Sequence, residues 1–419
     1  MFMNGVIKKN QHEKYSWLFL LCSALAVSNL FLYGSYILLI MSVFFFVFEQ
    51  KIVVCGKSVI LTLFALTYFV FRMLSGNSAF SAIKPFVFVA CWEMSYMLSK
   101  KKSMAQIFLL ITVLALGMAA HGVMNFIYNS ISGTKMIEGK SFDFWSQSIS
   151  ASTGQAINFT LFLSIFFWML FLQSKTTLKI IGGVLLLIST LYDVQLGGRT
   201  FFILIGLSIV SSIVLLIALG AIKPRYLKRF FPIFLIFIFS AIVIYVMYVN
   251  DVFDIKTAVE KSYLFKRLNS KYSKGLQEDG RIAAKKAYWK LFFQYPFGGN
   301  RISAENNIFA HELWLDVYDD AGIIPYIFLC IYSISVLTTI AKIIRFCNID
   351  VGVKVGLINY TVVLYAQFFV EPILSGAPLL FASFLMIDAA LTQYYHSYTR
   401  SRKEPVFNQR AIYENSFCV

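Results

Sequence analysis

A single histidine stands among carboxylates at the point where a polar stretch of the sequence becomes apolar. The stretch GGNRISAENNIFAHELWLDVYDDAGIIPY runs from Gly298 to Tyr326 and contains His311 followed directly by Glu312. An imidazole near its ordinary pKa can accept and return one proton, so His311 is a candidate general base. Glu312 and Asp316, one position and about one helical turn further on, would raise the pKa of that imidazole. An ordinary interfacial histidine explains the same local pattern, and both interpretations stay open.

Two cations stand at the start of a predicted helix just upstream. In the stretch EDGRIAAKKAYWKLFFQYPFGG a glycine precedes Arg281, and the helical spacing that follows places Lys285 one turn later on the same face. A helix N-terminus that carries two cations suits a pyrophosphate group. A solvated basic face on an interfacial helix is the alternative, and residues 290–299 are typical of an amphipathic piece on a membrane surface.

A third cation follows two glycines in the stretch QLGGRTFF. The glycines permit a tight backbone turn, and the guanidinium of Arg199 suits bidentate binding of phosphate. An interfacial arginine that reaches toward lipid headgroups would have the same local sequence.

Several charged residues fall within or beside apolar segments, where charge is costly and usually faces a bundle interior or an aqueous cavity. They are Arg72, Lys84, Glu93, Asp193 and Glu371. Arg72 and Lys84 flank the short turn SGNS, and together with Asp193 they would line one polar cavity that faces outward. The alternative is a set of structural ion pairs, for example Arg72 or Lys84 with Glu93.

Other classes of site have no signature in the sequence. We find no metal-ligand cluster, phosphate-binding loop or serine nucleophile motif, so no metal or cofactor is expected. His121 is interpreted as a packing residue. The cysteines lie far apart, without metal or redox spacing, and are also interpreted as packing residues. They are Cys22, Cys55, Cys91, Cys330, Cys347 and Cys418.

Composition places the chain in the class of polytopic membrane proteins. Of its 419 residues, 58% are hydrophobic and only 14% are charged, and the apolar residues form long runs. The formal net charge is +16. The basic residues are divided among short loops instead of forming one patch with interleaved aromatics, which argues against nucleic acid as a partner and favours anionic membrane lipids.

Apolar windows long enough to cross a bilayer can be placed about twelve times. A hydrocarbon core of about 30 Å needs roughly 20 apolar residues per helix. The predicted spans are 15–32, 34–50, 58–75, 79–98, 104–128, 151–173, 177–196, 200–222, 230–250, 320–343, 351–370 and 376–396. The predicted fold class is therefore an all-α polytopic membrane protein.

The distribution of lysine and arginine predicts the orientation. With both termini in the cytoplasm, most basic residues of the short loops lie on the cytoplasmic side, whereas the short outer loops contain only Lys135, Lys140 and Arg199. The candidate site residues then all lie on the outer side. The predicted regions are nine helices in 1–250 with an outer loop at 129–150, a large outer loop at 251–319, three helices in 320–396 and a cytoplasmic tail at 397–419.

The order of these features resembles the O-antigen polymerase and O-antigen ligase superfamily, GT-C-like polytopic glycosyltransferases of the bacterial surface polysaccharide pathway. The resemblance covers the large loop between the ninth and tenth spans and three patterns in order, at Arg199, Arg281 and His311. The histidine motif departs from the family at two positions. Glu312 replaces the usual amide or hydroxyl residue, and Pro325 replaces the final glycine.

The resemblance implies a metal-independent transfer of a glycan from undecaprenyl pyrophosphate at the periplasmic face of the bacterial inner membrane. It implies that His311 acts as base toward the acceptor hydroxyl, with Glu312 beside it. The residues that it implies at the pyrophosphate are Arg199, Arg281, Lys84 and Lys285.

Two activities of the superfamily differ only in the acceptor. A polymerase gives the glycan to another undecaprenyl-linked repeat unit, whereas a ligase gives it to the lipid A core of lipopolysaccharide. The short separation between Arg281 and His311 favours the polymerase, for which a chain-length regulator is a candidate partner. A 12-span transporter is an alternative from another class, although no repeated half is evident.

Overall fold

The computed structural model describes most of the helical part of the chain. The described residues are 17–50, 52–78, 82–132, 140–173, 175–219, 246, 249–250, 260, 264–266 and 280–403. The predicted ninth span at 230–250 lies largely outside the described residues, and so do most of residues 251–279 of the large loop. The tail beyond residue 403 lies wholly outside them.

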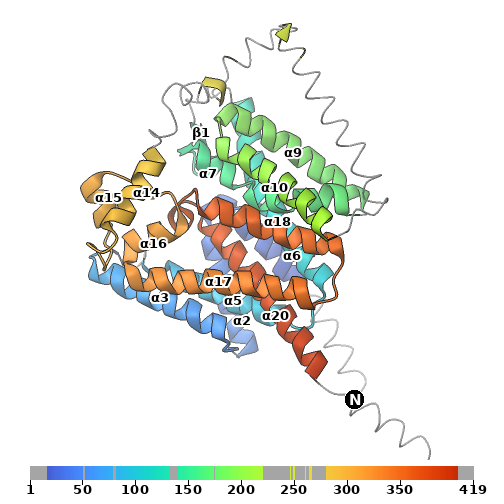
Figure 1. Ribbon diagram of the computed structural model, residues 1–419, viewed down its shortest axis with the longest axis horizontal. Helices are drawn as coiled ribbons and strands as arrows, with labels where there is room; N and C mark the ends of the chain where they lie inside the picture. The colour runs from blue at the N-terminus through green and yellow to red at the C-terminus, as the bar shows by residue number, and fades with distance from the viewer. Residues whose placement is uncertain are drawn as a thin grey trace, which may run out of the picture.

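The described residues form helices, apart from one short hairpin and the connecting loops (Figure 1). The helices are Trp17–Val27, α2 (Gly34–Glu49), α3 (Gly56–Leu74), α5 (Lys84–Leu98), α6 (Met104–Ile131), α7 (Ser152–Ile157), α8 (Thr160–Phe167), α9 (Thr176–Leu196), α10 (Arg199–Ala218), α14 (Gly280–Leu291), α15 (Arg301–Asn306), α16 (Leu313–Ala321), α17 (Ile323–Phe346), α18 (Val351–Phe368), α19 (Ile373–Gly376) and α20 (Pro378–Lys403). Single turns are η1 (Leu30–Leu32) and η2 (Trp168–Leu172). Strand β1 (Lys140–Phe142) pairs antiparallel with β2 (Ile149–Ala151).

The protein is a helical membrane protein, which confirms the coarse fold class. Among the described residues, six helices are long and apolar enough to cross a bilayer, namely α3, α6, α9, α10, α17 and α18. The outer face of α10 exposes Ile203, Val210, Val214 and Ile217. Such an apolar stripe is typical of a surface that faces lipid. The count of twelve spans stays a prediction.

The predicted single span at 151–173 is wrong in detail, because the chain is broken there into α7, α8 and the π-helical turn η2. Phe159 lies at the first break and is fully buried. Its ring packs onto Gly122 of α6, where a Cβ atom would come within 2.5 Å of the ring. Long-range packing of Phe159 accompanies this break, which falls next to the polar residue Asn158.

Polar side chains join three helices of the bundle. Asn359 of α18 donates to the hydroxyl of Ser208 on α10 at 2.6 Å and accepts from Ser211 at 3.0 Å. The Ser208 hydroxyl also donates to the carbonyl of Leu163 on α8 at 3.2 Å. Interhelical hydrogen bonds of this kind fix the relative register of membrane helices. Helices α8, α10 and α18 therefore form a fixed wall.

A buried ionic network ties together α3, α5, α17 and α20. Lys57 Nζ lies 2.6 Å from Asp388 Oδ1, and the other carboxylate oxygen accepts from Trp92 at 3.0 Å and from Tyr332 at 2.7 Å. The side chain of Lys57 is buried, although this residue lies at the start of α3. Asp388 was missed, although a lone aspartate in the apolar stretch FLMIDAAL was a signal for a buried partner.

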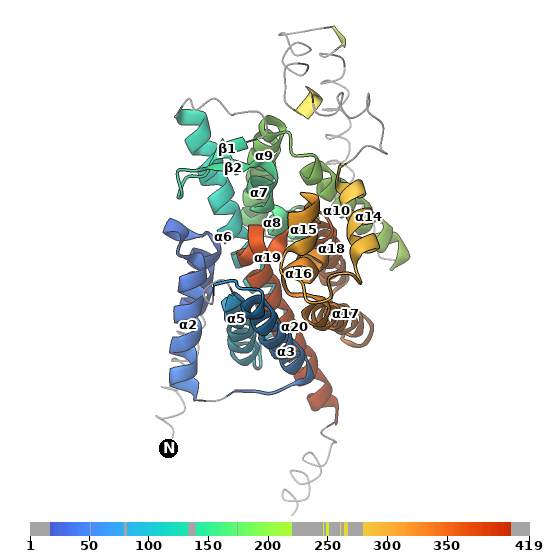
Figure 2. The same ribbon diagram turned by 90° about the vertical axis from the view of Figure 1, so that its left-hand side faces the viewer.

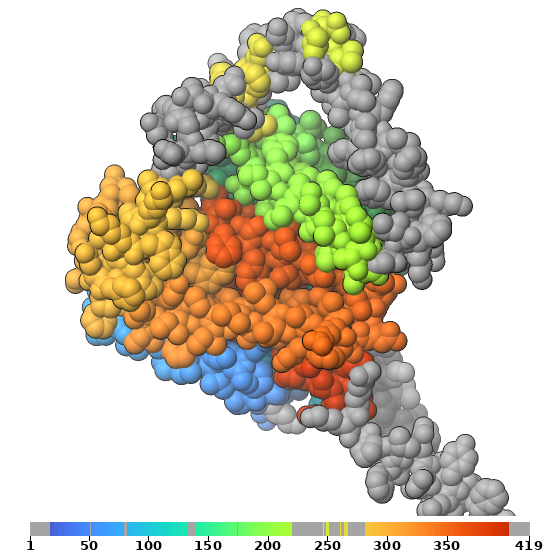
Figure 3. Space-filling model, in the orientation of Figure 1, coloured from blue at the N-terminus to red at the C-terminus, as the bar shows by residue number. Residues whose placement is uncertain are grey.

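One end of the bundle carries α14, α15 and α16 (Figure 1). Viewed onto that end, α19 lies beside α16, and the two helices pack together (Figure 2). In the space-filling view, the yellow α14–α15 segment forms one edge of the molecule, and orange α17 extends away from it (Figure 3). The segments that carry Arg281 and His311 are therefore neighbours at one end of the helices.

Replacing Asp388 by alanine leaves the buried Lys57 ammonium without its counter-charge, which we expect to lower the free energy of unfolding by about 3–5 kcal/mol. Thermal unfolding of the purified protein in detergent measures the loss. The control Asp350→Ala removes only the cap of α18 and should cost about 1 kcal/mol. The double change Lys57→Met with Asp388→Leu should recover most of the stability. An Asp388→Ala variant as stable as the wild type would contradict this role.

Candidate functional site

Arg281 fastens α14 to the end of α18. Arg281 lies in the first described turn of α14, and the predicted helix start stays a prediction because residues 267–279 lie outside the described residues. Its guanidinium donates to the carbonyl oxygen of Val370 at 3.0 Å and pairs with the carboxylate of Glu371 at 3.2 Å. Glu371 is 2% exposed, so the guanidinium compensates a buried charge.

Lys285 lies one helical turn later and makes a second attachment of the same kind. Its ammonium donates to the carbonyl oxygen of Phe369 at 2.6 Å and pairs with the carboxylate of Glu312 at 2.7 Å. Glu312 is buried and directly follows His311. The structure thus brings together Arg281, Lys285 and the histidine motif, which the sequence alone could only place in order.

His311 is held in an unusual conformation beside these cations. Its φ is 52°, in the left-handed region that costs energy for a residue with a side chain. Half-burial lowers the pKa of the imidazole, and the positive charges of Arg281 and Lys285 lower it further. The expectation that Glu312 and Asp316 raise this pKa is wrong, because Lys285 offsets the charge of Glu312. The imidazole is therefore neutral near pH 7 and has a lone pair ready to accept a proton.

Gly322 lies at the break between α16 and α17. Its φ is 88°, and a Cβ atom there would lie 2.4 Å from the carbonyl oxygen of Pro296. The next residue, Ile323, donates to that same oxygen at 2.9 Å. The opposing Gly298 also has a positive φ and no room for a side chain. These two glycines let the loop after α14 pack against the start of α17, which sets where α16 and His311 lie.

The three aspartates of α16 have different hydrogen-bond and ion-pair partners. Asp319 accepts from the Tyr288 hydroxyl at 3.1 Å, and Asp320 pairs with Arg72 at 2.9 Å. One carboxylate oxygen of Asp316 is buried without a hydrogen-bond partner. Burial, reinforced by the surrounding carboxylates, raises the pKa of Asp316 to about 8. Asp316 is thus protonated at neutral pH and adds no negative charge beside the cations.

The structure contradicts the predicted ion pair between Arg72 and Glu93 and the predicted position of Lys84 beside the other cations. Arg72 joins Asp320 of α16, so the suggested pairing with Glu93 is wrong. Glu93 is buried, and one of its carboxylate oxygens has no hydrogen-bond partner. Lys84 is exposed at the start of α5, and no described residue forms an ion pair with it. The structure therefore does not bring Lys84 into contact with Arg281 or Lys285.

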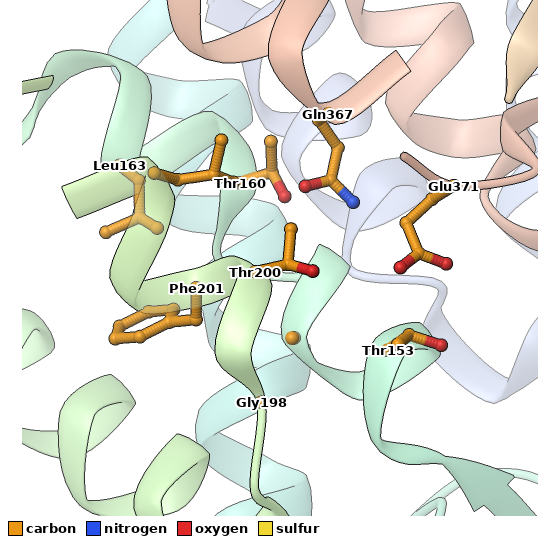
Figure 4. Close-up of a pocket in the computed structure, with 10 residues that line it drawn as sticks. Thr153, Thr160, Leu163, Gly198, Thr200, Phe201, Gln367 and Glu371 are labelled. Atoms are coloured by element: carbon orange, nitrogen blue, oxygen red, sulfur yellow. The ribbon is translucent and has the colours of Figure 1, made fainter. Parts of the chain in front are cut away.

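Arg199 begins α10 beside a small cavity. The preceding turn places Gly197 at φ 68°. A Cβ atom on Gly198 would lie 2.3 Å from the buried carboxylate of Asp193. Gly198 and Thr200, the neighbours of Arg199, both line the cavity (Figure 4). Glu371 lines it too. Glu371 also pairs with Arg281 of α14. The carboxylate of Glu371 therefore lies between the start of α10, which carries Arg199, and α14.

The interpretation of His121 as a packing residue was incomplete. Its Nε2 lies 2.8 Å from Asp143, in the loop between the two strands. Asn125 donates to the same aspartate at 3.1 Å and also to Gln155 of α7. This polar cluster holds the short outer loop against α6 and α7. Among the described residues, the free cysteines include Cys22, Cys55, Cys91 and Cys330.

Comparison with known proteins adds no relative. No protein-family model matches the sequence, and no curated protein matches it.

Gly322→Ala forces a side chain into a backbone conformation that essentially only glycine adopts, and into contact with the carbonyl of Pro296. We expect a loss of at least about 1–3 kcal/mol in the free energy of unfolding, measured by thermal unfolding in detergent. Gly183→Ala on α9 is the matched control, because a Cβ atom there meets nothing within 4 Å. Equal stability of the two variants would mean that the turn at Gly322 is not required.

Asp316 predicts a dependence of stability on pH. Its pKa is about 8 in the folded protein and 3.8 in an exposed carboxyl, so between these values the folded state keeps a proton that the unfolded state has lost. The stabilisation that this proton provides is complete below about pH 4 and disappears as the pH rises through about 8. Asp316→Asn should therefore unfold at higher temperature than the wild type at about pH 9, and the difference should shrink toward about pH 5. A difference in melting temperature that is constant across this range would contradict the assignment.

Proposed function

We propose that this protein is a glycosyltransferase that moves a glycan from undecaprenyl pyrophosphate to a sugar hydroxyl, and specifically an O-antigen polymerase. The observation that carries the proposal is the pair of cations one helical turn apart, Arg281 and Lys285, beside a neutral imidazole. This reaction needs cations that stabilise the departing pyrophosphate and a base that accepts the proton of the acceptor hydroxyl. No metal is required for it.

The chemistry follows from these groups. The acceptor oxygen attacks the anomeric carbon of the donor glycan, and the bond from that carbon to the pyrophosphate oxygen breaks. His311 takes the proton of the attacking hydroxyl, and undecaprenyl pyrophosphate departs with the bonding electrons. Arg281 and Lys285 stabilise the charge that develops on the leaving group, with Arg199 as a third cation at the start of α10.

Each cation has a carboxylate partner in the ligand-free structure. Glu371 holds Arg281, and Glu312 holds Lys285. A bound pyrophosphate shares or replaces these partners, so Glu312 acts by holding Lys285 and by keeping the charge beside His311 balanced. That role gives a reason for a glutamate at a position where the resembling family has an amide or hydroxyl residue.

The location of the site supports transfer over transport. The cavity beside Gly198 and Glu371 lies where α10 begins and α18 ends. A transporter is instead expected to bind its substrate between matching halves at mid-membrane. In the proposed topology of about twelve spans, with both termini in the cytoplasm and the large loop in the periplasm of a bacterial inner membrane, donor and acceptor reach the site from the outer leaflet.

The lipopolysaccharide profile of a strain that lacks the gene tests the activity. A polymerase defect leaves a core with one repeat unit on a gel. A bare core with accumulating lipid-linked polymer would instead identify a ligase with the lipid A core as acceptor. An unchanged ladder would reject both.

Complementation with His311→Ala tests the base. We expect a loss of about 10²–10⁴-fold in the rate of polymer formation, because the acceptor hydroxyl loses its proton acceptor. His396→Gln is the matched control, since His396 contacts Tyr96 in another part of the molecule and should leave the ladder intact. Immunoblots of the membrane fraction check insertion. Full activity of His311→Ala would remove the histidine from the mechanism.

A further inference from the structure

Helix α14 has three faces with different surroundings. On one face, Ala284, Tyr288 and Phe292 are buried at successive turns of the helix. On the second face, Arg281 and Lys285 pair with buried carboxylates. These two faces attach α14 to the rest of the protein, and the third face points away from it.

The third face of α14 is exposed and mainly apolar. Ile282, Trp289 and Phe293 follow one another at spacings of seven and four residues, which places them on one side of the helix. The side chains of Trp289 and Phe293 are 57% and 82% exposed. Lys286 and Lys290 are exposed on the same side. Large apolar side chains gathered on one exposed face mark a surface that binds a partner.

This exposed face lies directly beside two helices that are long and apolar enough to cross a bilayer, α3 and α17. Phe297, in the loop after α14, is also exposed, and its ring stacks on Phe71 of α3 with 5.9 Å between centroids. The ring of Phe292 contacts Tyr326 at the start of α17, with 5.3 Å between centroids. The isoleucines that α17 exposes from that point on are Ile327, Ile331 and Ile334. The apolar face of α14 is therefore continuous with surfaces that face lipid.

The position of α14 in the molecule fits the border between lipid tails and water. The helix lies at one side of the molecule in the view onto this end of the bundle (Figure 2), and its yellow segment forms an edge in the space-filling view (Figure 3). It is attached where α18 ends and close to where α17 begins. The ends of membrane-spanning helices lie at the depth of the lipid headgroups, where tryptophan is enriched.

The chemistry of the exposed face selects an anionic lipid surface. Aromatic rings insert between headgroups, and lysines attract lipid phosphates. A second copy of the chain is disfavoured as the partner, because a two-fold contact through this face would bring the lysines of both copies toward each other. We propose that Ile282, Lys286, Trp289, Lys290 and Phe293 form an interfacial anchor, which rests among the headgroups of an anionic leaflet while the opposite cations of α14 stay available to the site.

Photo-crosslinking from the exposed face tests the anchor. The full-length protein carries a photoreactive residue through the change Phe293→p-benzoylphenylalanine and is reconstituted into liposomes of phosphatidylglycerol and phosphatidylcholine in equal amounts. After irradiation, mass spectrometry of the intact protein detects lipid adducts. We expect a phospholipid adduct, with phosphatidylglycerol in excess, because the ring at position 293 lies among headgroups beside two lysines.

Matched variants separate the anchor from general exposure. The same photoreactive residue at Ala304 of α15, an exposed position next to the polar residues Glu305 and Asn306, should give little or no lipid adduct. The double change Lys286→Gln with Lys290→Gln should lower the ratio of phosphatidylglycerol to phosphatidylcholine adducts by about fivefold or more. Phe297→p-benzoylphenylalanine is the second probe position and serves where the change at Phe293 prevents insertion.

Three results would overturn the anchor. They are a lipid adduct at position 293 no stronger than at position 304, a crosslinked dimer of the chain in place of the lipid adduct, and an adduct ratio that the two lysine changes leave unaltered. Crosslinking to lipid does not require glycosyl transfer. The anchor can therefore fail while the proposed function survives, and an inactive role for His311 in polymer formation would leave the anchor intact.

Discussion

Two ion pairs, one helical turn apart, fasten α14 to the membrane bundle, and the candidate site depends on them. In each pair the carboxylate is the buried partner, with side-chain exposures of 3% for Glu371 and 9% for Glu312, whereas Arg281 and Lys285 are 34% and 31% exposed. Separating either pair would leave a buried negative charge uncompensated, which is strongly unfavourable. The helix is therefore held where its two cations face the loop of His311.

These pairs also set the charge balance of the site. With Glu371 and Glu312 paired and Asp316 protonated at neutral pH, the negative charges close to the cations are already compensated or absent. For the proposed reaction, binding of pyrophosphate becomes an exchange of partners at Arg281 and Lys285. Because the existing ion pairs are lost in this exchange, the net free energy of pyrophosphate binding is smaller than it would be for unpaired cations. The weaker binding allows the product, undecaprenyl pyrophosphate, to leave.

Polar contacts elsewhere hold the frame on which this exchange would take place. The network of Lys57 and Asp388 joins four helices, and Asn359 joins α10 to α18 beneath the cavity. Gly298 and Gly322 set the close packing of the loop that precedes His311. A rigid frame matters because His311 is kept in a left-handed conformation, which persists only where the surroundings enforce it.

The sequence by itself determined the membrane class and the placement of Arg281 and Lys285 on one helix face, because composition and periodicity are local properties. Only the tertiary structure decided which carboxylates those cations meet, since Glu371 lies 90 positions from Arg281. It also decided the lowered pKa of His311, which follows from burial and from cations that are not its sequence neighbours. The same holds for Phe297, which joins the exposed face of α14 to α3 only because its ring stacks on Phe71. The burial of a side chain and its interaction with charges far away in the sequence depend on the whole folded molecule. A local sequence pattern therefore does not determine them.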